Sequence, residues 1–360
     1  MFEGKTVAAV VPCYNEETQV GGVLETMPEV VDLVLVVDDA SPDGTAEVVE
    51  RHIAERQAGG GPEVVLLRHE RNRGVGAAIC TGYAEARRRR IDITAVMAGD
   101  GQMDPDQLDA LVAPVARGRA DYAKANRLFY QGAWGTIPRH RYLGNAFLSM
   151  MTKIASGYWH VADSQTGYTT ISLPALDLLN LEAVYPRYGY PNDLLVRLNL
   201  YDLRVADVHL RPVYNVGEQS KLRPWRVIPR MTWLLFTLFL WRMKEKYVIR
   251  DFHPLVLFYG AGLLTGLMSV GFFVRLLYVW SVTGVIPEIN TLVWALCAIS
   301  STQFGLFAMW FDMEMNRHLN CNMPVPPPPP PSAGEPETGT GRTPASAARP
   351  ASPPAEGDDA

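Results

Sequence analysis

The sequence of 360 residues predicts an α/β domain, built on a mostly parallel sheet with helices on both faces, followed by a membrane anchor. Up to about residue 125, short apolar runs alternate with longer helical patterns, an order typical of parallel sheets covered by helices. Residues 255–274 and 289–311 contain no charged side chain. As helices rising about 1.5 Å per residue, both are long enough to span the roughly 30 Å hydrocarbon core of a bilayer.

The whole-chain averages hide this division. With 48% hydrophobic residues, a mean hydropathy of -0.01 and a net charge of -5, the chain resembles an ordinary soluble enzyme. Residues 322–360, however, are rich in Pro, Ala, Gly, Ser and Thr and hold most of the net negative charge, which predicts a disordered tail. The remainder is nearly neutral, so no nucleic-acid partner is expected. Four cysteines without a CxxC pair indicate neither a disulfide framework nor a zinc site.

Each expected strand of the first half runs directly into a cluster of polar residues. The clusters read CYNEE, DDASPDGT, RHERNRG and AGDGQMD in chain order. Ligands of parallel sheets bind outside the carboxyl ends of the strands, so we expect these clusters to form one binding site. The expected strands are residues 6–11, 33–37, 63–67 and 93–97, and the expected helices are residues 17–27, 44–57 and 75–89.

The second half contains one expected helix at residues 142–156 and further polar motifs up to residue 224. Residues 225–252 then include an apolar core, Met231 to Trp241, which is too short to cross a membrane and is flanked by basic residues and tryptophans. This composition is typical of a helix lying in the membrane interface. A buried helix of the soluble domain is the alternative interpretation.

Charge indicates the orientation of the two spans. Six basic residues crowd the approach to the first span, whereas the connector at residues 281–288 has none. The positive-inside rule then places both ends of the chain in the cytosol, and no signal peptide is visible before the first strand. Arg275 is expected to snorkel to the interface, and Gly262 and Gly266 permit close helix contact within or between subunits. The six basic residues are Arg226, Arg230, Arg242, Lys244, Lys246 and Arg250.

Carboxylates after the strands indicate nucleotide and metal binding. Asp38 or Asp39 can accept hydrogen bonds from a ribose or a base edge. Asp100, Gln102 and Asp104 place oxygen ligands at alternate positions, and hard cations such as Mg²⁺ take such ligands together with substrate phosphates. Each motif alone has a simpler interpretation as a turn or a helix cap. Their occurrence together favours a binding site.

Taken together, VPCYNEE, DDASPDGT, NRGVGAAICTGY and MAGDGQMDP resemble glycosyltransferase family 2. The later segments DSQTGY, YGYPNDLLVRL and GEQSKLRPWRVIP, followed by an interfacial helix and two spans, resemble its polyprenyl-phosphate branch, which includes the dolichol-phosphate mannose synthases. The resemblance covers about residues 5–312 and implies a fold of the GT-A type. It implies a cytosolic glycosyltransferase domain at 1–224, an interfacial amphipathic region at 225–252 and a transmembrane hairpin at 253–312, and it leaves the Pro-rich tail at 322–360 outside.

The resemblance further implies an integral membrane enzyme that moves a sugar, with inversion, from a GDP- or UDP-linked donor to polyprenyl or dolichyl phosphate at the cytosolic face. A divalent cation, Mg²⁺ or Mn²⁺, would hold the donor diphosphate on Asp100 and Gln102. A lipid phosphate is already ionised and can attack the anomeric carbon itself. The tasks left to the protein are therefore orientation and stabilisation of the leaving diphosphate.

The resemblance also assigns roles to single residues. Asp100, Asp163 and Asp193 match acidic catalytic positions near the metal and the sugar. Arg127, Arg141 and Asn145 match positions that receive the acceptor phosphate. The positions that match the nucleotide-sugar site are Pro12, Tyr14, Glu16, Asp39, Lys221 and Arg223.

Two positions depart from the family pattern. Ala98 stands where a carboxylate usually begins the DxD motif, and Thr169 stands where an arginine is common. Ala98 removes one charged metal ligand and leaves open a second interpretation, a membrane-tethered nucleotide-sugar sensor or scaffold. A processive polysaccharide synthase is a further alternative, although the chain lacks the QxxRW motif and the additional spans typical of that class.

Overall fold

The computed structural model describes residues 1–56, 61–127, 139–211 and 224–322. In this part of the chain, seven strands form one sheet in the order β3-β2-β1-β4-β6-β5-β7. Only β6 runs antiparallel to its neighbours, β4 and β5, so the predicted mostly parallel sheet is confirmed. The strands are β1 Val7–Cys13, β2 Leu33–Asp38, β3 Glu63–Arg68, β4 Ile93–Val96, β5 Tyr122–Asn126, β6 Thr169–Ser172 and β7 Val205–His209.

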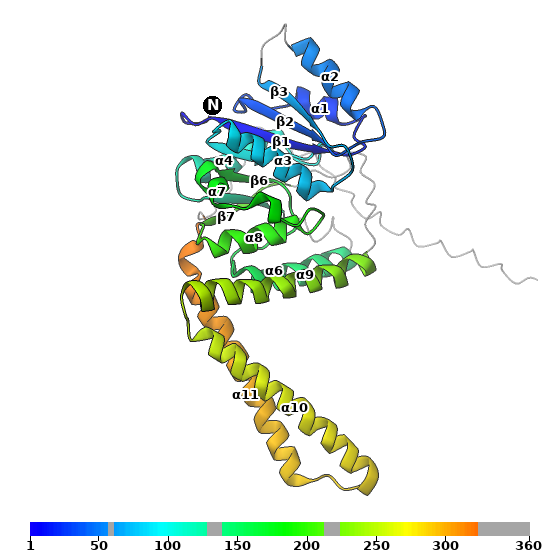
Figure 1. Cartoon of the computed structure of the whole chain (residues 1–360), viewed down its shortest axis with the longest axis vertical. Helices are drawn as coiled ribbons and strands as arrows, with labels where there is room; N and C mark the ends of the chain where they lie inside the picture. The colour runs from blue at the N-terminus through cyan, green and yellow to red at the C-terminus, as the bar shows by residue number, and fades with distance from the viewer. Residues whose placement is uncertain (57–60, 128–138, 212–223, 323–360) are drawn as a thin grey trace, which may run out of the picture. The chain divides into compact units, whose positions relative to one another are not determined.

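Helices cover both faces of the sheet (Figure 1). In β1, Ala8 and Val10 join the apolar cluster on one face, whereas Val7, Ala9 and Val11 join the cluster on the other. Burial on both faces explains why β1 is a continuous apolar run. The helices that follow the strands are α1 Val20–Glu25, α2 Thr45–Arg56, α3 Val75–Arg88, η1 Pro105–Gln107, α4 Leu108–Ala116, α6 Arg139–Ser156, α7 Leu173–Leu178, η2 Leu181–Ala183 and α8 Tyr190–Leu200.

The four predicted strands and the four predicted helices are confirmed, with ends that differ by a few residues. Strands β5, β6 and β7 are not among the predicted elements. Their central positions hold buried polar side chains such as Lys124, Thr170 and Asp207, so they lack the apolar runs that mark β1 and β2.

Helix α9, Pro224–Lys244, lies beside α6 and also packs on α8 (Figure 1). Leu235 and Leu238 face this contact and are buried. Other apolar side chains of the two helices are exposed, and Trp233 is the most open of them, with 67% of its surface free. The pair therefore has an apolar surface that the protein itself does not cover. The exposed residues are Phe147, Met150, Trp233, Phe236 and Leu240.

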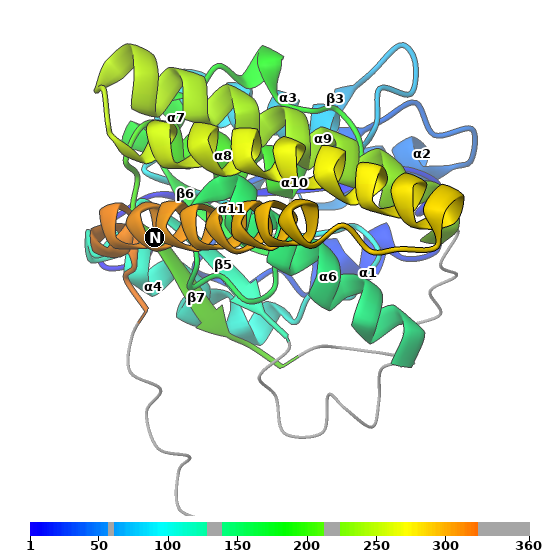
Figure 2. The ribbon, with the colours of Figure 1, turned by 90° about the horizontal axis from the view of Figure 1, so that it is seen from below.

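After α9 comes one stretch of π-helix, η3 Glu245–Arg250, and then two long apolar helices, α10 Leu255–Thr283 and α11 Glu288–Met315. The two lie side by side as a hairpin (Figure 2). Both are long and apolar enough to cross a membrane, and their most apolar windows are only 17% and 11% buried, unlike core helices of a soluble protein.

Small residues permit the close contact within this hairpin. Ser301 of α11 donates its hydroxyl to the Gly262 carbonyl of α10 at 2.8 Å. A methyl group at Gly266 would lie 2.8 Å from the Ser301 hydroxyl oxygen. The GxxxG spacing therefore serves contact within one chain. Beyond α11, the short helix η4 Arg317–Leu319 leads the chain back to the edge strand β7, where Asn320 forms a bridge with Val205.

Candidate active site

The candidate site lies at the carboxyl ends of β1, β2 and β4, where the sequence places its polar clusters. Asn15 and Ala40, in the loops after β1 and β2, have φ angles of 60° and 58°. This left-handed conformation is uncommon for residues with a side chain and persists only where the surroundings hold it. The two loops are therefore held in defined conformations.

Hydrogen bonds between the two loops supply that support. In both directions, backbone N–H groups of one loop donate to side-chain oxygens of the other. Among the predicted nucleotide-binding residues beside them, Tyr14 is exposed, and Pro12 and Glu16 are half-buried. The bonds are Asn15 N–H to Ser41 Oγ at 3.1 Å, Glu16 N–H to Thr45 Oγ1 at 3.0 Å and Gly44 N–H to Glu17 Oε2 at 3.1 Å.

Asp39 is buried and orders the start of α3. Its Oδ1 is 2.7 Å from His69 Nδ1 and accepts the Arg73 N–H at 2.8 Å, and its Oδ2 accepts the Gly74 N–H at 2.7 Å. Gly74 has a φ of 99° and directly precedes the helix. The carboxylate thus has three partners within the protein. A contact to the base or ribose, which the resemblance implies, stays a prediction.

The predicted metal ligands Asp100 and Gln102 lie in the loop after β4, and both are half-buried. The Gln102 N–H donates to Asp100 Oδ1 at 3.1 Å, which turns the loop. In the described residues, no group of three or more His, Cys, Asp or Glu side chains could hold a metal ion. One carboxylate and one amide oxygen fit a cation that keeps waters and takes its remaining ligands from substrate phosphates, as Mg²⁺ commonly does.

The surroundings of Cys13 show that negative charge gathers at this edge. Burial raises the pKa of the Cys13 thiol, and the carboxylates of Glu16, Asp38 and Asp100 raise it further. The neutral thiol fills the space below Gly99, where a methyl group would lie 2.7 Å from its sulfur. A metal ion bound at this edge would be stabilised by the negative charge of these carboxylates, of which Asp38 also faces Arg68 at 3.8 Å.

Asp163 lies on the other side of the sheet's centre, after α6, and pairs with Arg127. Arg127 Nε is 2.8 Å from Asp163 Oδ2, and the Gln165 N–H donates to Oδ1 at 3.1 Å. Burial raises the pKa of Asp163, but Arg127 and the nearby Lys124 outweigh it, so the pKa lies below its usual value. The ionised Asp163 fixes the half-exposed Arg127 guanidinium in position.

Beneath this pair lies a buried polar group that the sequence analysis missed. Lys124 donates to the Thr166 carbonyl. Asp207 Oδ2 accepts from Asn126 Nδ2 at 2.7 Å and from the Ala162 N–H at 3.1 Å. Burial lowers the pKa of Lys124 to about 8 and raises that of Asp207 to about 6. The available signal was a charged residue at the centre of a short apolar run, as in YAKAN and VADVH.

Asp193 is buried in the first turn of α8. Its Oδ1 is 3.0 Å from Arg197 Nε, and its Oδ2 accepts the Tyr185 N–H at 2.6 Å. Burial raises the pKa of Asp193, and Arg197 opposes this effect. These contacts tie the helix to the segment before it. The predicted role of Asp193 near the sugar stays a prediction.

The remaining predicted residues are only partly visible. Arg141 and Asn145 belong to the first half of α6, but their side chains lie outside the described part of the structure. Lys221 and Arg223 lie outside the described residues altogether. A cavity of about 350 Å³ is found between the start of α3, the segment before α8 and α9. It is lined by Gly74, Val75, Tyr185, Arg187, Tyr188, Arg230 and Met231.

Comparison with known proteins gives consistent matches. The family model described as glycosyl transferase family 2 matches residues 8–177. A UDP-N-acetylglucosamine–dolichyl-phosphate N-acetylglucosaminyltransferase of Methanococcus voltae is 27% identical, over 59% of this chain and 87% of the relative. An undecaprenyl-phosphate mannosyltransferase of Micrococcus luteus is 28% identical, over 60% and 87%. A polyprenol monophosphomannose synthase of Mycolicibacterium smegmatis is 30% identical, over 52% and 70%.

Proposed function

Because the chain belongs to glycosyl transferase family 2, we propose that it transfers a sugar from a nucleotide-sugar donor to a polyprenyl phosphate at a membrane surface. The observation that carries this proposal is what the relatives have in common. By their names, they differ in the sugar, which is N-acetylglucosamine or mannose. All three names contain a phosphorylated polyprenol or dolichol. The acceptor class is therefore the better supported half of the proposal.

The membrane elements support a lipid acceptor. The two apolar helices α10 and α11 are long enough to span a bilayer, and the exposed apolar side chains of α6 and α9 precede them in the chain. Such side chains favour the interface between water and lipid. A polyprenyl phosphate has its reactive group at the same interface. The arrangement therefore brings the α/β domain to its substrate.

On the donor side, the chain supplies carboxylates and ordered loops. A divalent cation held by Asp100 and Gln102 would neutralise the charge that develops on the leaving diphosphate. The loops after β1 and β2, fixed by their mutual hydrogen bonds, would receive the nucleoside, with Pro12, Tyr14 and Glu16 beside it. Lys221 and Arg223 are proposed to cover the diphosphate.

On the acceptor side, Arg127 is the residue whose geometry is best defined. Its guanidinium is held by the buried Asp163 and is partly open, so it can bind a phosphate without losing its position. Arg141 and Asn145 on α6 are proposed to bind the same phosphate. An oxygen of the lipid phosphate forms the new bond to the anomeric carbon while the bond from that carbon to the diphosphate oxygen breaks. This single displacement inverts the configuration and needs no base.

We propose that the α/β domain faces the cytosol. Fewer basic residues than expected are available to support this orientation. Arg242 and Lys246 were counted among the basic residues beside the first span, yet both are engaged in contacts within the protein. Arg230 and Lys244 are exposed, Arg250 is exposed but donates to the Leu200 carbonyl at 2.9 Å, and the connector between the spans has no basic residue. The asymmetry on which the positive-inside rule rests is therefore smaller but keeps its direction.

The test is incubation of membranes containing the chain with labelled GDP- and UDP-sugars and a polyprenyl phosphate. We expect one donor to give a product that extracts into organic solvent and is labile to mild acid. Absence of a lipid product with every donor would contradict the proposal and favour the nucleotide-sugar sensor. Alkaline-stable polymer in place of a glycolipid would indicate the polysaccharide synthase.

A further inference from the structure

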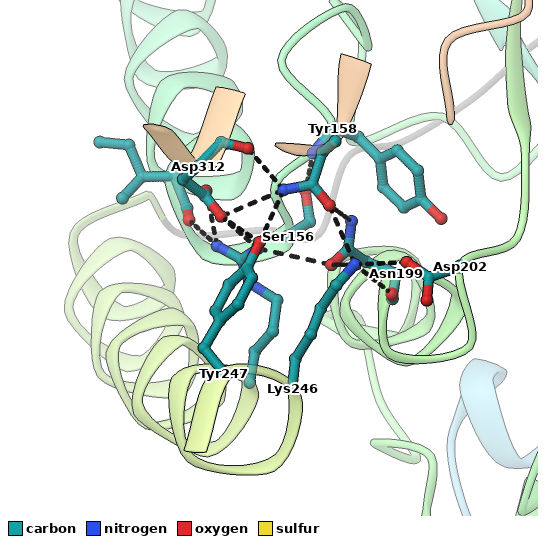
Figure 3. A network of polar contacts seen from close by, with 10 residues as sticks. Ser156, Tyr158, Asn199, Asp202, Lys246, Tyr247 and Asp312 are labelled. Carbon is teal, nitrogen blue, oxygen red and sulfur yellow. Dashed lines mark hydrogen bonds and ion pairs between the residues drawn. The ribbon is translucent and has the colours of Figure 1, made fainter. Parts of the chain in front are cut away.

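Four helices of the chain meet at one buried polar network (Figure 3). Its residues are not among those of the candidate active site. Its centre is Arg242 of α9, whose two terminal nitrogens each lie 2.9 Å from one carboxylate oxygen of Asp312. Both side chains are 0% exposed. Asp312 is in the last turn of α11, directly after the uncharged stretch of the second span. The pair thus joins α9 to the membrane hairpin.

Arg242 also contacts the ends of the two helices that pack on α9. It donates to the Ile154 carbonyl in the last turn of α6 at 3.1 Å and to Asn199 Oδ1 near the end of α8 at 3.4 Å. The last carbonyls of a helix have no partner within the helix and carry partial negative charge, which cations stabilise. One guanidinium therefore ties the carboxyl ends of α6, α8 and α11 to α9.

The π-helix η3 completes the network. Lys246 donates to the Asn199 carbonyl at 2.9 Å and to Asp202 Oδ1 at 2.7 Å, and Tyr247 donates its hydroxyl to Asp312 Oδ1 at 2.7 Å. Asn316, beyond α11, accepts from Asn199 Nδ2 at 2.8 Å. These bonds surround the ion pair with polar partners, without which a buried pair would be costly, although Arg242 Nε itself has none.

The backbone packs closely against the network. Gly157, directly after α6, has a φ of 78°, and a methyl group there would lie 2.5 Å from an Arg242 terminal nitrogen. The chain after Asn316 is also attached: Cys321 N–H donates to the Val205 carbonyl at 3.2 Å, and Asp207 N–H donates to Asn322 Oδ1 at 2.8 Å. The second span is thus joined to the helices and to the edge strand of the sheet.

We propose that Arg242 and Asp312 are positioning residues, which set the height of the acceptor-phosphate site relative to the bilayer. This inference rests on the proposed function. Helix α6 has 18 residues, about 27 Å of length, and it carries Arg141 and Asn145 in its first half. Its far end is fixed to the second span through Arg242. The network therefore determines whether a phosphate held at the membrane surface reaches the site.

The height of the acceptor-phosphate site relative to the bilayer matters only for an acceptor that is anchored in the bilayer. A long-chain polyprenyl phosphate cannot leave the membrane to follow a displaced site, and misplacement by about 1 Å can cost up to a hundredfold in rate. A short, water-soluble prenyl phosphate diffuses to the site wherever it lies. A defect in positioning therefore separates the two acceptors, whereas a general loss of folding does not.

The test uses the full chain in vesicles and the double variant Arg242→Met/Asp312→Leu, which removes both charges and leaves neither unpaired in the interior. We expect kcat/KM for the long-chain acceptor to fall at least about tenfold, mainly through KM, and kcat/KM for the short acceptor to change less than about twofold. Arg242→Lys, which keeps the positive charge opposite Asp312 but not the paired geometry of the guanidinium, should show the same selectivity if the double variant does not fold. The exposed pair Arg117 and Glu3, replaced as Arg117→Met/Glu3→Leu, is the matched control and should change neither acceptor.

Equal losses for both acceptors, or no loss for either, would overturn the inference. A nitroxide on Met150→Cys, a position 57% exposed on α6, gives a second readout that needs no catalysis. Its depth in the bilayer should change in the double variant, with Cys80 and Cys321 replaced by alanine throughout. An unchanged depth would contradict the inference. A changed depth in a protein that transfers sugar to no acceptor would contradict the proposed function alone.

Discussion

The candidate active site and the network around Arg242 are both clusters of charged side chains, but their charges are balanced in opposite ways. At the active site, the carboxylates of Glu16, Asp38 and Asp100 converge closely enough to raise the pKa of Cys13. In the network, every described carboxylate faces a cation, and the central pair is fully buried. The first cluster is half-open and rich in carboxylates, which suits a bound cation, whereas in the second each described carboxylate is neutralised by a cation of the protein itself.

This difference determines what substitutions should do. Removing a charge from the active site should reduce activity and leave the fold intact, because the fold gains little stability from a half-buried carboxylate. Removing one partner from a buried pair should destabilise the fold, because the other charge is left without compensation. The following predictions test this distinction from the largest expected effect to the smallest.

Asp100→Ala should have the largest effect on catalysis. The variant loses the charged ligand of the proposed cation, which corresponds to several kcal/mol of transition-state stabilisation, or about a thousandfold in rate. The measurement is sugar transfer at saturating donor and cation. Asp106→Ala removes an exposed carboxylate from η1, directly after the same loop, and is the control. Full activity in Asp100→Ala would show that the metal assignment is wrong.

Arg127→Met should affect both activity and stability. The proposed acceptor phosphate loses a cation, which should raise KM for the acceptor about tenfold or more, and Asp163 is left buried without its partner. The double variant Arg127→Met/Asp163→Asn should regain much of the unfolding free energy but none of the activity. Recovery of activity in the double variant would place the phosphate site elsewhere.

Asp207→Asn should change how stability depends on pH. Burial raises the folded pKa of Asp207 to about 6 from a usual value of 3.8, so the folded state binds the proton more tightly than the unfolded state does. The contribution of this group to stability is therefore greatest below pH 3.8 and falls as the pH rises to about 6. The neutral variant should lack this fall, worth about 3 kcal/mol. Thermal unfolding between pH 4 and 7 measures it, and parallel curves for both proteins would contradict it.

Gly99→Ala should have the smallest effect. Its methyl group would lie 2.7 Å from the Cys13 sulfur, and overpacking of this kind costs about 1 kcal/mol or more. We expect Gly99→Ala to lower both stability and cation affinity. Adding Cys13→Ala should restore both, because removal of the sulfur makes room for the new methyl group. No rescue by the second substitution would mean that the Asp100 loop is not positioned by this contact.

The first half of the fold could be predicted because its signals are local. In β1 and β2, continuous apolar runs end in polar clusters, and the order of strand and helix then gives a parallel sheet. In β5 and β7, Lys124 and Asp207 interrupt the pattern, and only their partners across the sheet explain why a charge lies there. Such partners are not visible in the sequence around them.

In the candidate site, too, local motifs could be predicted from the sequence but long-range contacts could not. Asp100 and Gln102 could be proposed because they lie in one short motif. Asp39 could be singled out, but not its three hydrogen bonds to the segment before α3. Arg242 appeared to be one basic residue of an interfacial helix, since its partner Asp312 lies 70 residues further along the chain. Contacts of that range depend on how the helices pack.

The central claim, transfer of sugar to a polyprenyl phosphate, is tested most directly with purified protein in vesicles by measuring nucleoside diphosphate release and glycolipid formation together. The account predicts that release depends on added polyprenyl phosphate and equals the glycolipid formed, mole for mole. Release that proceeds equally well without the lipid, or lipid-dependent release without a glycolipid, would contradict it.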